Sequence, residues 1–362
     1  MSTIGSTLLT ILEFIIAFGA LVFLHELGHF LAARLNKIDV EEFGFGYPPK
    51  MVKLFRAGGT DFTLNWIPFG GFCRMKGEAG DILEPGSFAS ANPWRRLVTL
   101  LGGPVINLLV GMLLIAFLFT RIGAPDLTKV EITGIAPNSP AAENLMVGDF
   151  IEKINDTPIT SMDGLTEVVN QYLGEEVSIS VRRDSELLQF EITPRENPPA
   201  NEGSMGVVIS NPTQKISYLQ AIPMAFVSTM DQGYQLLMLP VRLISGQIAP
   251  SDARMVSVKG IYDIFLQVKT VDQQEAAVDP SVKGLNILSF FALISIALGF
   301  TNLLPIPALD GGHILFLIPE ILFKKRVKPE LEGRVHFIGY VLLMALMVIM
   351  VINDIINPVV LH

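Results

Sequence analysis

Four long apolar stretches constrain this chain more than any other feature, because a helix needs about 20 mostly apolar residues to cross a bilayer. Two of them run for 23 and 25 residues without a charge, and the first carries only Glu13. No Arg or Lys precedes Arg34, so the first stretch lacks the basic start of a cleavable signal peptide. The sequence predicts four spanning helices, at Leu8–Leu24, Leu97–Phe119, Leu285–Leu309 and Phe337–Ile352.

The composition agrees with a chain that lies in lipid and disfavours several other classes of protein. Charged residues make up 17% of the 362 residues, against about 25% in soluble domains. The net charge of −9 disfavours a surface that binds nucleic acid. A single cysteine, Cys73, excludes a disulfide scaffold. We therefore expect the lipid bilayer as a partner and no nucleic acid.

The connection between the second and third stretches, Arg121–Gly284, is typical of soluble protein. Its first part, Asp126–Glu202, holds 15 Asp and Glu against 5 Lys and Arg. Short β-rich runs alternate with turns around one helical stretch, which predicts a small α+β domain over residues 123–210. The expected strands are Lys129–Ile135, Phe150–Ile154, Val177–Arg182 and Leu187–Ile192, and the expected helix is Asp163–Tyr172. The next segment, 211–284, is predicted to be membrane-associated. Its stretch Ile216–Ile248 is amphipathic, and we expect it on the membrane surface or against the spanning helices.

Basic residues indicate the orientation of the spans. Arg34–Arg96 holds 9 Lys and Arg in 63 residues, and Ile314–Arg334 holds 5 in 21. Arg121–Lys283 holds only 12 in 163. By the positive-inside rule, the two shorter connections lie in the cytoplasm, and the acidic domain and both termini lie outside it.

Three ionisable residues continue the first apolar stretch in the pattern His25-Glu26-x-x-His29. Histidines four residues apart share one face of a helix and can bind one zinc ion, and Glu26 beside them can take a proton from metal-bound water. A chance pair of helix-end histidines is the alternative. Ionisable groups that extend a membrane helix are costly and usually functional, so the pattern favours a metal site.

A catalytic zinc site needs a third protein ligand and an open position for water. Asp310 follows the 25 uncharged residues of the third stretch, and a buried carboxylate needs a partner such as a divalent cation. His313, three residues further on, is the alternative ligand. We favour Asp310 and expect His313 at the next interface or in contact with a ligand.

Two prolines interrupt the end of the third stretch. Pro305 and Pro307 lack N–H donors and break regular helix geometry. An unwound segment at membrane depth is tolerable only where it lines a cavity or binds a partner. Asn302 adds an amide donor and acceptor there. The alternative is a kinked helix that serves only packing.

These motifs together resemble the site-2 protease family of intramembrane zinc metalloproteases, specifically the bacterial regulator-of-sigma-E protease group. The resemblance rests on His25–His29 and on Asn302–Gly311, which matches the family pattern Asn-x-x-Pro-x-x-x-Leu-Asp-Gly. Gly102–Asn107 resembles the family element that opens the second span. Phe43–Gly46 and Ile67–Gly71 resemble parts of its membrane-associated β region.

The resemblance implies a role for each matching residue. His25, His29 and Asp310 would bind Zn²⁺, Glu26 would be the general base, and Asn302, Pro305 and Pro307 would hold the substrate backbone. It also implies cleavage within transmembrane segments of membrane proteins, such as anti-sigma factors or remnant signal peptides. The location implied is the inner (cytoplasmic) membrane of a bacterium, which the chain would cross several times.

The acidic domain resembles a single PDZ domain. The resemblance rests on Ile135–Ala142 followed by Val147–Ile151. The run Gly203–Val208 would supply an edge strand and a carboxylate-binding loop that includes Gly206. PDZ domains bind an extended peptide by strand addition and capture its C-terminus. A spacer or a size filter for substrates is the alternative role.

The expected fold is therefore a polytopic α-helical membrane protein with a membrane-associated β region and an inserted α+β PDZ domain. The predicted divisions are residues 1–122, 123–210, 211–284 and 285–362, with the metal motifs in the first and last. Two other functions remain as alternatives. One is a membrane adaptor with an inactive metal site, although no metal-site residue is lost. The other is a transporter, against which four spans without an inverted repeat argue.

Overall fold

The computed structural model describes residues 3–78, 82–199, 202–248 and 254–360. The chain divides into two compact units, which are described separately: residues 119–221 form one, and residues up to 118 together with those from 222 onward form the other. Residues 249–253, inside the predicted 211–284 segment, lie outside the described part.

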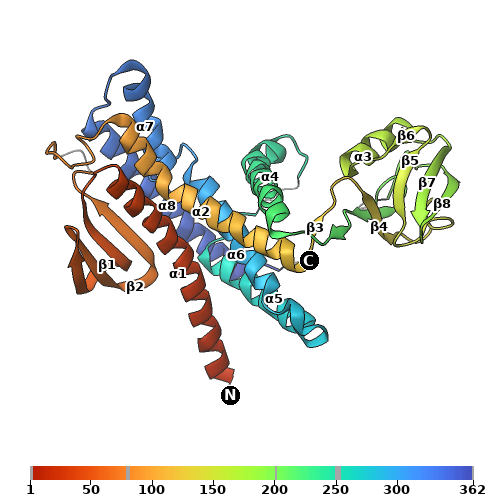
Figure 1. The fold of residues 1–362 in the computed structure, drawn as a ribbon, viewed down its shortest axis with the longest axis horizontal. Coiled ribbons are helices and arrows are strands. Elements are labelled where there is room, and N and C mark those ends of the chain that lie inside the picture. Colours follow the sequence, from red (N-terminus) through yellow and green to blue (C-terminus); the bar gives the residue numbers. More distant parts are fainter. Residues whose placement is uncertain (1–2, 79–81, 200–201, 249–253, 361–362) are drawn as a thin grey trace. The chain divides into compact units, whose positions relative to one another are not determined.

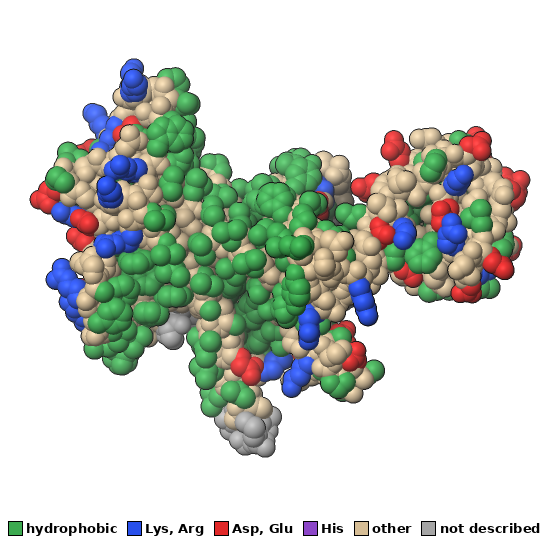
Figure 2. Space-filling view, in the orientation of Figure 1, with side chains coloured by type: hydrophobic (Ala, Val, Ile, Leu, Met, Phe, Trp, Pro, Cys, Tyr) green, Lys and Arg blue, Asp and Glu red, His purple; other side chains and the backbone are tan. Residues whose placement is uncertain are grey.

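Four helices of the described residues are long and apolar enough to cross a membrane, and they lie at the four predicted stretches. They are α1 (Thr3–Leu35), α2 (Pro93–Ile122), α6 (Leu285–Asn302) and α8 (Pro329–Ile356). Figure 2 shows hydrophobic side chains covering this helical unit. Glycines let α1 and α2 meet backbone to backbone: a Cβ on Gly28 would lie 2.2 Å from the carbonyl oxygen of Gly102.

The third apolar stretch, Leu285–Leu309, is helical only as far as Asn302. Helix α6 ends at Asn302, a non-helical segment follows, and a further helix, α7, runs from Asp310 to Phe323. The two prolines lie within the non-helical segment, which agrees with the predicted unwinding. Helix α7 was not predicted, because Ile314–Arg334 was interpreted as a connection between the last two spans.

A long hairpin connects α1 and α2 (Figure 1). Strands β1 (Val40–Ala57) and β2 (Thr60–Met75) pair antiparallel. Glycines in β2 let the hairpin lie against α1: a Cβ on Gly70 would be 2.4 Å from a methyl group of Val22. The expected β region is therefore present, and it runs along the helix that carries the two histidines.

The predicted 211–284 segment contains two long helices, α4 (Tyr218–Ile244) and α5 (Val258–Val278), and a short 3₁₀ turn, η1 (Pro280–Val282). Helix α5 packs inside the helical unit, since its Phe265 is buried against Phe14 and Phe290. The buried carboxylate of Asp272 accepts hydrogen bonds from Gly284 N–H and Asn286 N–H at the start of α6. The predicted amphipathic stretch Ile216–Ile248 corresponds to α4 and not to α5, and a Cβ on Gly233 of α4 would lie 2.2 Å from the ring of Phe300 on α6.

The 119–221 unit is built on one twisted sheet with strand order β8-β7-β5-β4-β9. Its elements are β3 (Ala124–Pro125), β4 (Val130–Ile135), β5 (Phe150–Ile154), β6 (Thr157–Pro158), α3 (Met162–Gln171), β7 (Val177–Arg183), β8 (Glu186–Ile192), β9 (Val207–Ser210) and β10 (Thr213–Gln214). Alternate strand residues such as Val130, Ile132 and Ile179 fill the core beneath α3. The predicted bounds of the four strands and of the helix lie within two residues of the observed bounds.

Candidate active site

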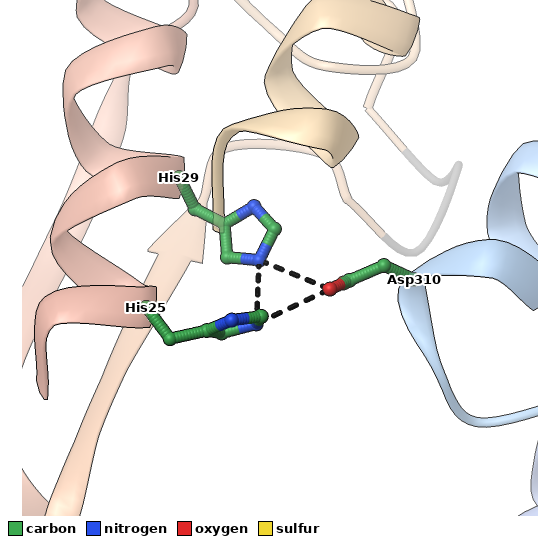
Figure 3. A group of neighbouring side chains, drawn as sticks. All are labelled: His25, His29 and Asp310. Carbon is green, nitrogen blue, oxygen red and sulfur yellow. Dashed lines mark hydrogen bonds and ion pairs between the residues drawn. The ribbon is translucent and has the colours of Figure 1, made fainter. Parts of the chain in front are cut away.

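His25 and His29 on α1 converge with Asp310, the first residue of α7 (Figure 3). The two Nε2 atoms lie 3.2 Å apart. Asp310 Oδ2 lies 3.2 Å from Nε2 of His25 and 3.4 Å from Nε2 of His29. Both histidines are buried, and Asp310 is largely so. The structure thus brings together the three residues predicted to bind zinc.

The spacing of these three atoms fits a tetrahedral metal ion. Zinc bonds of about 2.0–2.1 Å at tetrahedral angles place neighbouring ligand atoms about 3.3–3.4 Å apart. The three observed separations are 3.2, 3.2 and 3.4 Å. The chemistry of the donor set, two imidazole nitrogens and one carboxylate oxygen, is that of catalytic zinc sites.

The partners of the other imidazole nitrogens fix how the histidines point. His29 Nδ1 lies 2.9 Å from the carbonyl oxygen of Thr99, which can only accept, so Nδ1 carries the proton and Nε2 turns its lone pair to the cluster. His25 Nδ1 lies 3.3 Å from the side-chain amide of Asn107. The amide oxygen of Asn107 is buried without a partner, and a 180° turn of the amide would let it accept from Nδ1–H.

Helix α2 supplies these contacts and also the space for the histidines. A Cβ on Gly103 would lie 2.3 Å from His29 Nε2 and 2.7 Å from His25 Nε2, so only glycine fits there. Gly102–Asn107 was predicted from the sequence only as a family element, without a role. Its two glycines and its Asn inside an apolar helix were the signal for a helix that approaches a polar site.

Glu26 lines the same cavity, of about 510 Å³, as the three converging residues. Cys73 on β2 lines this cavity as well. The cavity is partly polar: Tyr47 and Glu78 also line it, and neither was singled out from the sequence. Burial raises the pKa of Glu78, although a hydrogen bond from the Met75 N–H lowers it in part.

The residues predicted to hold substrate lie in different places. Asn302 ends α6, lines the cavity and donates from its amide to the carbonyl oxygen of Leu298 at 3.0 Å. Pro305 and Pro307 lie in the segment between Asn302 and Asp310 and are not among the cavity-lining residues, and Pro305 is exposed. Gly206 belongs to the other unit, where it precedes β9 with a φ of 74°.

His313, the alternative third ligand, is not in the cluster. It lines the cavity, but its Nδ1 lies 3.3 Å from Glu332 Oε1. Its ring stacks on that of His336, with 3.7 Å between centroids. Neither Glu332 nor His336 was assigned a role from the sequence, because nothing in the sequence relates α8 to the metal motifs.

Comparisons with known proteins agree with this geometry. The model of peptidase family M50 matches residues 13–346 of the chain. The regulator of sigma-W protease RasP of Bacillus subtilis is 28% identical over 429 residues, which cover 96% of this chain and 98% of RasP. The zinc metalloprotease RasP of Shouchella clausii is 29% identical over 430 residues, with the same coverage.

A solved structure is similar to part of the chain. The PDZ domain of the SdrC-like protein from Listeria monocytogenes matches 23% of this chain and 87% of its own length, at 19% identity and a TM-score of 0.21. The family match extends over both metal motifs and confirms the predicted peptidase over an adaptor or a transporter. The chain belongs to peptidase family M50, the site-2 protease family, and is a zinc metalloprotease.

Proposed function

We propose that this protein is an intramembrane endopeptidase that hydrolyses peptide bonds within the transmembrane segments of other membrane proteins. One observation carries the proposal: a metal-ligand triad and a carboxylate share one polar cavity among helices long enough to span a bilayer. Hydrolysis within lipid requires such a cavity, since water and charged groups are otherwise excluded.

His25, His29 and Asp310 would hold the zinc ion. Bound zinc acts as a Lewis acid and lowers the pKa of water to about 7. Thr99 accepts from Nδ1–H of His29, and Asn107 with its amide turned would accept from Nδ1–H of His25, so that each imidazole would offer an unprotonated Nε2. In this proposal Glu26 takes the proton of the attacking water and returns it to the leaving amine nitrogen.

Substrate would enter the cavity as an unwound segment. A helix in lipid keeps every backbone donor and acceptor paired, so the enzyme must offer replacement partners. Asn302 at the end of α6 lines the cavity and would offer its side-chain amide, and the non-helical segment with Pro305 and Pro307 would offer backbone carbonyls. RasP of Bacillus subtilis is by name a regulator of sigma-W. Anti-sigma factors, and by the same chemistry remnant signal peptides, are therefore the substrates we propose.

We further propose that the 119–221 unit is a PDZ domain that binds peptide C-termini. Strand β9 lies at the edge of the sheet, and a groove of about 260 Å³ lies between it and α3. The loop Gly203–Gly206 closes one end of this groove, as a carboxylate-binding loop would. The charge distribution favours the bacterial cytoplasmic membrane with this domain on the extracytoplasmic side.

The test compares purified wild-type protein in detergent with Glu26→Gln and Asp310→Asn. We expect one zinc per chain in the wild type and in Glu26→Gln, and cleavage of a membrane-spanning peptide slowed about 10²- to 10⁴-fold in Glu26→Gln. Asp310→Asn should lose both zinc and activity. Glu13→Gln is the matched control, because Glu13 lies on the same helix but pairs with Lys269.

Two results would contradict the proposal. Wild-type turnover by Glu26→Gln would remove the general base from the mechanism. Full zinc content in Asp310→Asn would show that Asp310 is not a zinc ligand and would favour His313 as the third ligand.

A further inference from the structure

The residue two positions before Asp310 has an unusual backbone conformation. Ala308 has a φ of 77°, in the left-handed region that side chains with a Cβ rarely adopt. Such a conformation persists only where surrounding contacts hold it. Here the Ala308 N–H donates a hydrogen bond to Nδ1 of His336 on α8, at 2.9 Å.

A second residue of α8 packs against the backbone just before Ala308. His336 and Gly339 lie three residues apart and so share one face of α8. A Cβ on Gly339 would lie 2.4 Å from Cβ and 2.9 Å from the carbonyl oxygen of Pro307. Gly333 on the same helix has open space around it. Helix α8 therefore meets the Pro307–Ala308 backbone at two points one turn apart.

The hydrogen bond from Ala308 also argues against His336 as a metal ligand. His313, Glu332 and His336 have potential ligand atoms within 4.8 Å of one another, which suggests a second metal site. His336 Nδ1 accepts from Ala308, so in the neutral ring the proton is on Nε2. A protonated Nε2 offers no lone pair to a metal. His313 and Glu332 instead hold the ring of His336 in place, through stacking and the His313–Glu332 contact.

We propose that His336 is a positioning residue for the zinc ligand Asp310, and that α8 sets the metal affinity through it. By accepting from Ala308, His336 holds the loop in the left-handed turn from which Asp310 reaches His25 and His29. Helix α8 carries none of the three converging ligands, so this assigns the last span a function at the site. The inference rests on the proposed zinc site.

The test measures zinc affinity of the full-length protein in detergent by competition with a chromophoric chelator. His336→Ala should bind zinc about five- to a hundredfold more weakly, the effect of one lost buried hydrogen bond. The oxygen of Asn can occupy about the place of Nδ1, whereas that of Gln reaches towards Nε2. His336→Asn should therefore retain most of the affinity and His336→Gln should not. The absorption spectrum of the Co²⁺-loaded protein should change in His336→Ala and return towards wild type in His336→Asn.

A rescue experiment tests the backbone argument directly. Glycine adopts positive φ without steric cost. Ala308→Gly should therefore restore part of the zinc affinity lost in His336→Ala. The glycines of α8 provide a test that leaves His336 intact: Gly339→Ala should weaken zinc binding, while Gly333→Ala, the same substitution in open space, should not.

The outcomes separate this inference from the proposed function. If Asp310→Asn binds zinc like the wild type, the proposed site fails. If Asp310→Asn loses zinc while His336→Ala and Gly339→Ala bind it normally, only the positioning role is overturned. A wild type with two zinc ions per chain, reduced to one by His336→Ala, would overturn it in favour of a second metal site. If His336→Ala does not fold, the zinc affinities of Gly339→Ala and Gly333→Ala test the positioning role instead.

Discussion

Gly103 allows the metal site to be tested without removal of a ligand. A Cβ in Gly103→Ala would lie 2.3 Å from His29 Nε2 and 2.7 Å from His25 Nε2, whereas ordinary contacts begin at 3.4 Å. The two imidazoles would therefore have to move away by about 1 Å, which is the difference between the clash distances and an ordinary contact distance. The alternative, a shift of α2 away from α1, would separate the close backbone packing of Gly28 against Gly102.

Such a displacement is large for a metal site. Metal–ligand distances in proteins hold to about 0.2 Å, so a shift several times larger breaks at least one bond. We expect Gly103→Ala to lower zinc affinity at least about a hundredfold, the upper effect of changes next to ligands. The assay is zinc content after dialysis against a chelator, together with cleavage of a membrane-spanning peptide with and without added zinc.

Gly111→Ala is the control, because it introduces a clash of similar size on the same helix. Its Cβ would lie 2.4 Å from a side-chain carbon of Ile296, away from the histidines. We expect lower thermal stability but full zinc content. Full zinc retention in Gly103→Ala would refute the placement of the histidines. Equal zinc loss in both variants would attribute the effect to helix packing alone.

Three further predictions concern substrate handling and the 119–221 unit. Asn302→Ala should slow cleavage of a stably helical substrate about five- to a hundredfold, with zinc content unchanged. Cleavage of a substrate with helix-breaking residues should be slowed less. Equal slowing of both substrates in a kinetic comparison would show that Asn302 does not hold the substrate backbone. Burial opposes ionisation of Asp149, but hydrogen bonds from Arg183 hold the pKa of this carboxyl below its ordinary value. A lowered folded-state pKa stabilises the unit above the unfolded pKa, and this stability is lost as the pH falls below about 4. Asp149→Asn should therefore exchange amide hydrogens faster at pH 7 and respond less to acid, and an unchanged pH profile would argue against this. Gly206 has a φ of 74°, and a Cβ there would lie 2.1 Å from that of Ser139. Gly206→Ala should therefore weaken binding of a peptide with a free C-terminus in a fluorescence titration. A peptide with a capped C-terminus serves as the control.

The sequence alone determined those features that depend on near neighbours in the chain. Four apolar stretches predicted four long helices, because the bilayer thickness sets a minimum length that few other segments meet. The four-residue spacing of His25 and His29 placed both on one face of α1, since a helix repeats every 3.6 residues. The two prolines likewise predicted the break after Asn302, because proline removes a donor wherever it stands.

Only the tertiary structure decided which distant residues meet these motifs. Asp310 and His313 were both open as ligands in the sequence, and the packing of α7 brings Asp310 to the histidines while His313 turns to Glu332. His336 carried no local signal of its role, and the glycines of Gly102–Asn107 indicated only that this helix approaches a polar site. The reason is physical: these contacts depend on how helices pack against one another, and a single sequence specifies the face of each helix but not the neighbour that the face will meet.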